Sequence, residues 1–238
     1  MKAIELDPNL AEGYVAEAIV ALQYSLDWST SGRLLDQALA KDPNNLMALQ
    51  FRGHLTQAIG SIAEAERYMR RATELDPLNP LPRRYLARIV LNAGRPTESA
   101  AILRQAIDEN KNFPALHFEL ARALLVSGKP ADAAAAYEAE PSETWRVLGL
   151  PVAYHVTHRD ALAEGALAKL IAQSAGSEFQ VAEAYAVFGQ PDRAFEWLEH
   201  ARERHDAGLM YVRRDPLLAS LTADPRYRAL LRKMNLPE

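Results

Sequence analysis

The residues best able to do chemistry in this sequence form two columns with a constant spacing of 34 residues. The columns are His54, Arg88, Arg122 and Gln50, Arg84, Phe118. Arg84 and Arg88 are four residues apart, so on a helix both side chains would project from one face. Because guanidinium groups bind carboxylates through two parallel hydrogen bonds, the columns predict a basic patch that binds acidic side chains or a peptide carboxylate.

An alternative interpretation stays open, in which this patch is a solvated helix face whose arginines pair with glutamates such as Glu119. Trp145 shares a helix face with Leu148 and Val152, and it could extend the patch as an apolar pocket or fill irregular packing. The candidate partner-binding residues are Gln50, His54, Arg84, Arg88, Phe118, Arg122 and Trp145.

Other kinds of site lack support in the sequence. His155 and His158 are spaced as two ligands on a helix face, but no third ligand has clear spacing, so no metal site is expected. No phosphate-binding glycine loop, nucleophile–base–acid order or paired-carboxylate motif appears. The sequence therefore predicts a non-enzymatic protein with no cofactor and no catalytic residues.

The elements that must position the two columns repeat along the chain. The string Ala-Thr-Glu-Leu-Asp-Pro at Ala72 has counterparts at Ala38 and Ala106, each 34 residues away. Gly60, Gly94 and Gly128 repeat with the same period. Glycine ends helices readily, and a proline two residues later suits the first turn of the next helix. Each unit is therefore a helix, a short turn, a second helix and another short turn.

Small residues accompany this period at fixed positions. In the unit Leu46 to Pro77, Gly53 occupies the small position of the first helix, and Ala65 and Ala72 those of the second. The period and these positions resemble the tetratricopeptide repeat (TPR). The resemblance implies an all-α protein, a right-handed α–α superhelix of about six repeats with a C-terminal cap. We expect the repeats at 11–43, 46–77, 80–111, 114–140, 144–173 and 175–204.

The TPR resemblance also implies a concave groove, lined by the first helix of each repeat, on which the two columns would lie. The TPRs that hold the C-terminal carboxylate of chaperones use lysine and asparagine at positions where this sequence has Gln50 and His54, which argues against that ligand.

Four segments are predicted along the chain: residues 1–8 as the tail of a truncated upstream repeat, 9–140 as a regular array, 141–204 as divergent repeats after a bend, and 205–238 as capping helices. Pro151 should kink or delay the first helix after the bend. Because natural solenoids cap their ends, the half-repeat at the start predicts that the chain is a fragment of a longer protein.

Three stretches carry a narrower resemblance: those around Trp28 and Trp197, and the closing segment from Arg213 to Pro237. They are similar to the C-terminal TPR regions of bacterial multi-domain signalling proteins, which carry an upstream adenylate-cyclase, Ser/Thr-kinase or winged-helix domain. This implies a scaffold or regulatory arm that binds partner proteins or peptides. The alternative is a self-association module of an enzyme whose catalytic domain lies outside this chain.

Bulk composition limits the partners further. The 238 residues carry a net charge of -4, whereas nucleic-acid-binding domains are strongly basic. No window approaches the roughly 18 apolar residues of a membrane span, so no membrane insertion is expected. The absence of cysteine leaves the compartment open, with the cytoplasm favoured. The expected partner is a protein or peptide, with an acidic segment as one option, and homo-oligomers remain another.

Overall fold

The computed structural model describes residue 4 and residues 7–237. Within that part of the chain every regular element is helical, which confirms the predicted all-α solenoid. The predicted upstream half-repeat at 1–8 falls largely outside the described residues. The helices are α2 (Ala11–Gln23), α3 (Trp28–Lys41), α4 (Leu46–Ile59), α5 (Ile62–Leu75), α6 (Pro80–Asn92), α7 (Pro96–Glu109), α8 (Leu116–Val126), α9 (Pro130–Glu138), α10 (Glu143–Val156), α11 (Asp160–Ala172), α12 (Glu178–Val187), α13 (Pro191–Glu203), the 3-10 helices η1 (Ala207–Arg214) and η2 (Pro216–Leu221), and α14 (Pro225–Lys233).

The helices from α2 to α13 form consecutive pairs, and each pair corresponds to one of the predicted repeats, with α10 beginning one residue earlier at Glu143. The turns between the two helices of each pair account for this pairing. Gly94, Gly128 and Gly189 adopt positive φ angles of 77°, 72° and 71°, which glycine accepts at little cost. His158 takes the same turn position with φ 57°. Gly60 differs from the expected glycine turn, because its φ of -139° lies outside the left-handed region.

Small residues sit where the two helices of a repeat cross. A Cβ atom added to Gly53 would lie 2.9 Å from Cε of Met69, so a larger residue at position 53 would require the methionine side chain to shift. In the next repeat Ser99 occupies the corresponding close contact, and its hydroxyl donates a hydrogen bond of 2.7 Å to the carbonyl of Ala87. Close packing at these crossings builds two hydrophobic clusters among the described residues, a large one along most of the solenoid and a smaller one around Met69 between α5 and α6.

Pro151 lies inside α10, which runs without interruption from Glu143 to Val156. The helix is therefore not delayed by the proline, in contrast to one of the two predicted effects. Close packing continues there, because a Cβ atom on Gly149 would lie 1.9 Å from Cδ1 of Tyr137. The absence of a side chain at Gly149 thus lets α10 lie against the aromatic ring from α9.

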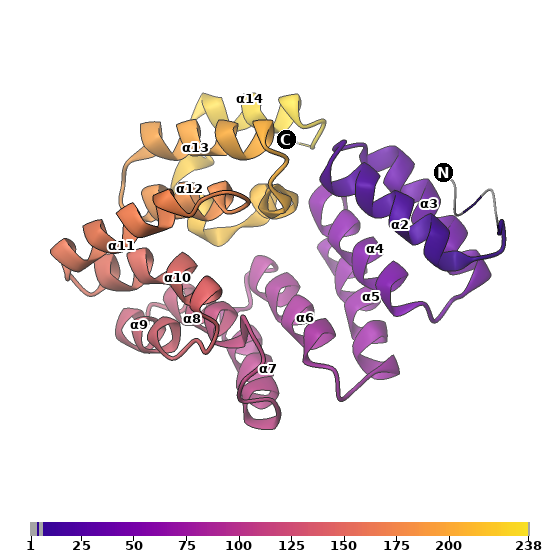
Figure 1. Cartoon of the computed structure of the whole chain (residues 1–238), viewed down its shortest axis with the longest axis horizontal. Coiled ribbons are helices and arrows are strands. Elements are labelled where there is room, and N and C mark those ends of the chain that lie inside the picture. The colour runs from indigo at the N-terminus through magenta and orange to yellow at the C-terminus, as the bar shows by residue number, and fades with distance from the viewer. Residues whose placement is uncertain (1–3, 5–6, 238) are drawn as a thin grey trace.

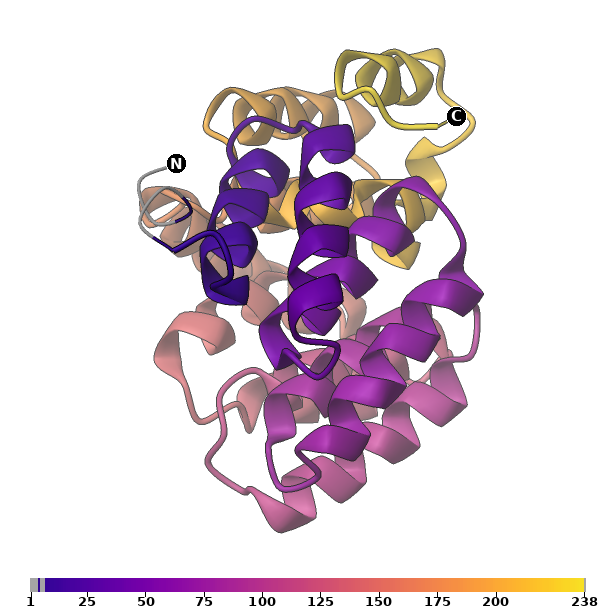
Figure 2. The same cartoon turned by 90° about the vertical axis from the view of Figure 1, so that its right-hand side faces the viewer.

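The solenoid curves until its two ends meet (Figure 1). Nε1 of Trp28 in α3 donates a hydrogen bond of 2.6 Å to the carbonyl of Met234, directly after α14. The Tyr24 and His205 rings stack with centroids 4.4 Å apart. Figure 2 shows the C-terminal helices beside the first pair in a view turned by 90°. The segment from η1 to α14 therefore does more than cap the last repeat, since it also joins the far end of the chain to its beginning.

None of the helices in the described part of the chain has the length and apolar character needed to span a bilayer.

Candidate functional site: the concave face

The predicted basic column lies on the inner side of the solenoid, but it is covered. Arg88 is 5% and Arg122 1% exposed, and His54 is 3% exposed. Gln50 and Phe118 are buried as well, whereas Arg84 and Trp145 remain partly exposed. Five of the seven candidate residues are thus inaccessible to a partner in this conformation.

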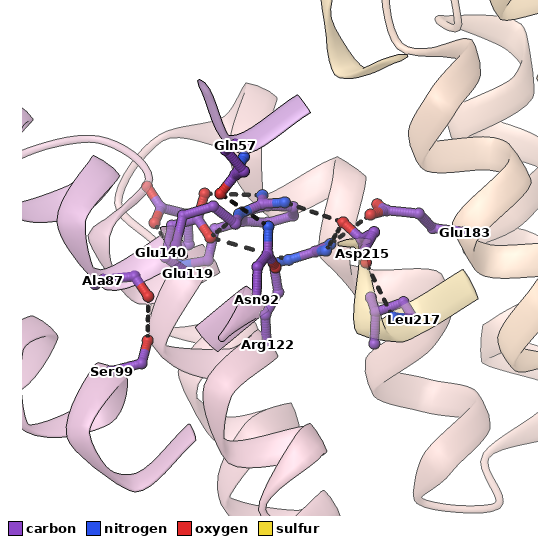
Figure 3. Close-up of polar contacts among 12 residues, drawn as sticks. Gln57, Ala87, Asn92, Ser99, Glu119, Arg122, Glu140, Glu183, Asp215 and Leu217 are labelled. Atoms are coloured by element: carbon purple, nitrogen blue, oxygen red, sulfur yellow. Dashed lines mark hydrogen bonds and ion pairs between the residues drawn. The ribbon is translucent and has the colours of Figure 1, made fainter. Parts of the chain in front are cut away.

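The two buried arginines belong to an ion network that gathers residues from the three helices α6, α8 and α12 and from the C-terminal segment (Figure 3). Arg88 donates two hydrogen bonds to the Glu119 carboxylate, Nε to Oε2 at 2.8 Å and Nη2 to Oε1 at 2.9 Å. The alternative interpretation of the patch expected pairing with Glu119 on a solvated helix face, whereas this pair is buried. Charge-assisted pairs of this geometry are among the strongest polar contacts in proteins.

Asp215 joins the two arginines from the other side. Its Oδ2 accepts hydrogen bonds from Nη2 of Arg122 at 2.5 Å and from Nη1 of Arg88 at 3.1 Å. Its Oδ1 accepts a hydrogen bond from the backbone N–H of Leu217, so Asp215 also caps η2. Glu183 of α12 completes the network, with Oε1 2.8 Å from Nη1 of Arg122.

The charges in this network shift the pKa values of its carboxyl groups. Burial alone would raise the pKa of Asp215, but Arg122 and Arg88 outweigh burial and hold it below its usual value. Burial raises the pKa of Glu183, and the neighbouring Asp215 carboxylate adds to that rise against the opposing effect of Arg122. The two arginines therefore hold the Asp215 carboxylate ionised, and Glu183 holds a proton more readily than an exposed glutamate does.

The sequence predicted an acidic ligand for these arginines, and in the structure a carboxylate of the same chain occupies that position. The sequence pattern showed Asp215 only as the Asp-Pro start of a capping helix. Asp215 lies 127 residues from Arg88 and 93 from Arg122, so no local spacing connects them. η1 and η2 carry it onto the inner side of the superhelix, with η1 against α4 and η2 against α12.

A cavity of about 360 Å³ remains beside the network. Its walls come from the inner helices α4, α6, α8 and α10, the start of α12, and the segment from Asp206 to Tyr211. Arg84 and Trp145 line it together with His54. The Arg84 guanidinium lies over the rings of Tyr85, at 4.8 Å, and Trp145, at 5.3 Å from the centroids.

Phe118 and Gln50 are buried against neighbouring parts of the protein. The Phe118 ring packs against Tyr137 and Trp145, with centroid distances of 5.5 and 5.2 Å. Trp145 thus packs at the junction of α8 and α10 and also lines the cavity. Gln50 is 8% exposed on α4 and does not line the cavity.

Sequence reasoning missed two buried acids that hold the inner helices in place. Glu140 is fully buried, and its carboxylate accepts backbone N–H groups of Ala115, Phe118 and Ser142. Asp206 likewise accepts the N–H groups of Phe179 and Gly208. The signal for Glu140 was present, because it replaces a repeat alanine just before a proline, where helix starts need acceptors.

The two histidines that were considered as metal ligands have different surroundings. His155 stacks on Phe188 at 4.2 Å, and His158 occupies the turn after α10. Among the described residues there is no group of three histidine, aspartate or glutamate side chains arranged to hold a metal ion.

Comparison with known families gives one match, to the tetratricopeptide repeat, over residues 52–114 and 86–144. These matched residues run from within α4 to the first residues of α10, at the centre of the array. The search of curated proteins found no match.

Solved structures with the same fold extend the likeness over nearly the whole chain. The Cut9–Hcn1 hetero-tetramer of the APC/C has a TM-score of 0.65 at 17% identity, covering 98% of this chain and 44% of the other. Yeast Tom70 has a TM-score of 0.60 at 18% identity, covering 98% and 52%. PilW, a type IV pilus biogenesis factor, has a TM-score of 0.59 at 15% identity, covering 93% and 98%. This chain therefore spans about half or less of the first two proteins, and the likeness shows a TPR solenoid fold.

Proposed function

We propose that this TPR solenoid is a scaffold or regulatory arm that binds partner proteins or peptides on its concave side. The fold is that of a protein–protein interaction module. The observation that carries the finer proposal is the cavity on the inner side, which presents Arg84 and Trp145 from two neighbouring inner helices. These residues contact the partner, while Gln50, His54, Arg88, Phe118 and Arg122 shape the surface from behind.

The proposed setting is a larger bacterial signalling protein. It rests on the three stretches around Trp28, around Trp197 and at the C-terminus. Two of them meet in space, because Trp28 donates its indole hydrogen bond to Met234. Two of the stretches on which this proposed setting rests thus lie at a contact that closes the superhelix.

The test begins with a photo-cross-linking residue at position 144, which is exposed and lines the cavity. A protein that cross-links there is purified, and its affinity for the chain is measured by calorimetry. We expect Arg84→Glu and Trp145→Ala each to weaken binding at least about tenfold, because interface aromatics and arginines carry much of the binding energy.

Arg67→Glu is the matched control. Arg67 lies on α5 with its side chain 78% exposed, and it does not line the cavity. All variants must keep the wild-type melting temperature. If the affinities of Arg84→Glu and Trp145→Ala equal that of Arg67→Glu, partners do not bind at the concave side and the proposal is wrong.

Self-association is the second candidate, favoured by an apolar face on α2. Val20 is 58% exposed and lies at a shallow cavity of about 490 Å³ that is also lined by Ala16 and Leu34. Sedimentation velocity over a concentration series tests it, with Val20→Glu as the variant. A concentration-dependent dimer that Val20→Glu abolishes would support self-association, and a monomer at every concentration would eliminate it.

A further inference from the structure

Arg84 differs from the other cations of the concave side in its partners. Arg88, which lines the same cavity, is neutralised by Glu119 and Asp215. Arg84 has no carboxylate within ion-pair distance among the described residues, and its buried Nε has no hydrogen-bond partner there. Its contacts are the faces of Tyr85 and Trp145. The cavity therefore contains a positive charge held in place by aromatic rings and left without an anion.

The carboxylates near this charge are already engaged. Glu119 is bound by Arg88 on both oxygens. Asp206 also lines the cavity, and its oxygens accept the N–H groups of Phe179 and Gly208. Neither side chain can turn toward Arg84 without leaving buried donors unsatisfied, which costs about 1–3 kcal/mol per group.

A second polar group of the cavity has no partner. His54 is 3% exposed, and its Nδ1 makes no hydrogen bond among the described residues. Burial, together with the positive charges of Arg84 and Arg88, lowers the pKa of His54 to about 3. At neutral pH the ring is uncharged, and the positive field that keeps it so would favour an anion at the same place.

The remaining walls are apolar and aromatic. The rings of Phe51, Tyr85, Trp145 and Tyr211 line the cavity together with Leu148 and Met210. A volume of about 360 Å³ lies in the range of small-molecule sites, which combine apolar walls with a few polar groups. The segment from Asp206 to Tyr211 forms one wall of the cavity. This wall closes the cavity on the side where the groove of an open repeat array would continue.

We propose that this cavity binds one carboxylate carried on a small flat apolar body, as in a free aromatic organic acid. The Arg84 guanidinium pairs with the carboxylate, and the aromatic walls cover the apolar body. The same carboxylate chemistry could be supplied by the C-terminus of a peptide that ends in an aromatic residue. This inference goes beyond partner binding, since it needs no protein partner and is tested on the isolated chain.

The test titrates the whole chain with phenylacetate and with its neutral analogue phenylacetamide, following the indole N–H resonance of Trp145. Trp145→Phe assigns that resonance. The expected dissociation constant for phenylacetate is about 1 mM, a usual affinity for a ligand of this size. Phenylacetamide should bind at least about tenfold more weakly, because a charge-assisted pair is lost.

Three variants locate the binding. Arg84→Gln should weaken phenylacetate binding at least about tenfold and leave phenylacetamide binding unchanged. Arg67→Gln, on the outer helix α5, should bind phenylacetate as the wild type does. Thr144→Trp keeps every charge but fills the cavity from an exposed lining position, so it should weaken both ligands.

N-acetylglycyl-phenylalanine, with a free or an amidated C-terminus, identifies the source of the carboxylate. If the free peptide binds more tightly than phenylacetate and its amide does not, a chain terminus is the natural source and the carboxylate site stands. The proposal is overturned if acid and amide bind equally, or if Arg84→Gln melts as the wild type and retains its affinity. Undiminished binding to Thr144→Trp would overturn it as well.

Discussion

The carboxylate of Asp215 lies 2.5 Å from Nη2 of Arg122, although the two residues are 93 positions apart. Both side chains are almost completely buried, at 0% and 1% exposure. The contact therefore ties the C-terminal segment to the inner wall of the solenoid at a point that water does not reach. In such surroundings the removal of one partner costs much more than at the surface, because the other charge stays buried.

Asp215→Asn should lower the free energy of unfolding by about 3 kcal/mol. Asparagine keeps an oxygen that accepts the Leu217 N–H, so the start of η2 is preserved and the loss reports on the arginines. Urea unfolding followed by circular dichroism gives the value. Asp108→Asn, at an exposed position on α7, is the control and should change stability by less than about 0.5 kcal/mol. Equal stability of the two variants would show that the network contributes nothing.

Glu183→Gln should change the pH dependence of stability between pH 5 and pH 8. Burial raises the pKa of Glu183 above its usual 4.5. The folded state therefore holds this proton where the unfolded chain has released it, so the wild type loses stability as the pH rises from 4.5 through the raised pKa. The loss is at most about 1.4 kcal/mol per pH unit. Glutamine does not titrate, so the variant should gain on the wild type between pH 5 and pH 8. Melting temperatures at both pH values check this, and a constant difference would contradict it.

The period of 34 residues was enough to predict the helix pairs, because each pair depends on local signals. The glycine turns and helix-start prolines act within a few residues, and the small residues at Gly53 and Ala87 act within one repeat. The helices of repeat proteins are easier to predict from local signals, since each unit contacts mainly its neighbours. The helix bounds follow from such signals with little need for distant information.

Whether the arginines of the candidate site are exposed depends on a contact with the C-terminal segment, which lies outside the repeats. Arg88 and Arg122 were predicted on the inner side, but their exposure is decided by η1 and η2, which lie outside the period. The path of a non-repeating segment cannot be deduced from a repeat pattern. The sequence held one indication, because a buried arginine requires a carboxylate and Asp215 directly precedes the apolar run from Pro216 to Ala219.

His54 should make the protein sensitive to mild acid. Its pKa is lowered to about 3 by burial and by Arg84 and Arg88, so the folded state keeps the ring neutral while the unfolded chain binds a proton below pH 6.5. Stability is therefore intact above pH 6.5 and falls as the pH drops through that value, by about 2 kcal/mol at pH 5. His54→Gln removes this dependence. Urea unfolding at pH 7.5 and pH 5 measures both proteins, and parallel losses would exclude His54 as the cause.

Two glycine-to-alanine substitutions separate close packing from helix propensity. A Cβ atom on Gly149 would lie 1.9 Å from the Tyr137 ring, whereas a Cβ atom on Gly165 has no atom within 4 Å outside its own helix. Both glycines lie inside helices, where alanine is the better helix former by about 1 kcal/mol. Gly165→Ala should therefore raise the free energy of unfolding by about that amount. Gly149→Ala should lower it by about 2 kcal/mol, because α10 must move away from α9.

Chemical denaturation of both variants, analysed with one shared m-value, compares their free energies of unfolding. The Tyr137 ring is 1% exposed and packs on Phe118, so it has no free space into which it can turn. Gly149→Ala combined with Tyr137→Leu should recover part of the lost stability, because the smaller side chain leaves room for the methyl group. If Gly149→Ala is as stable as Gly165→Ala, α9 and α10 are not packed as closely as the structure has them.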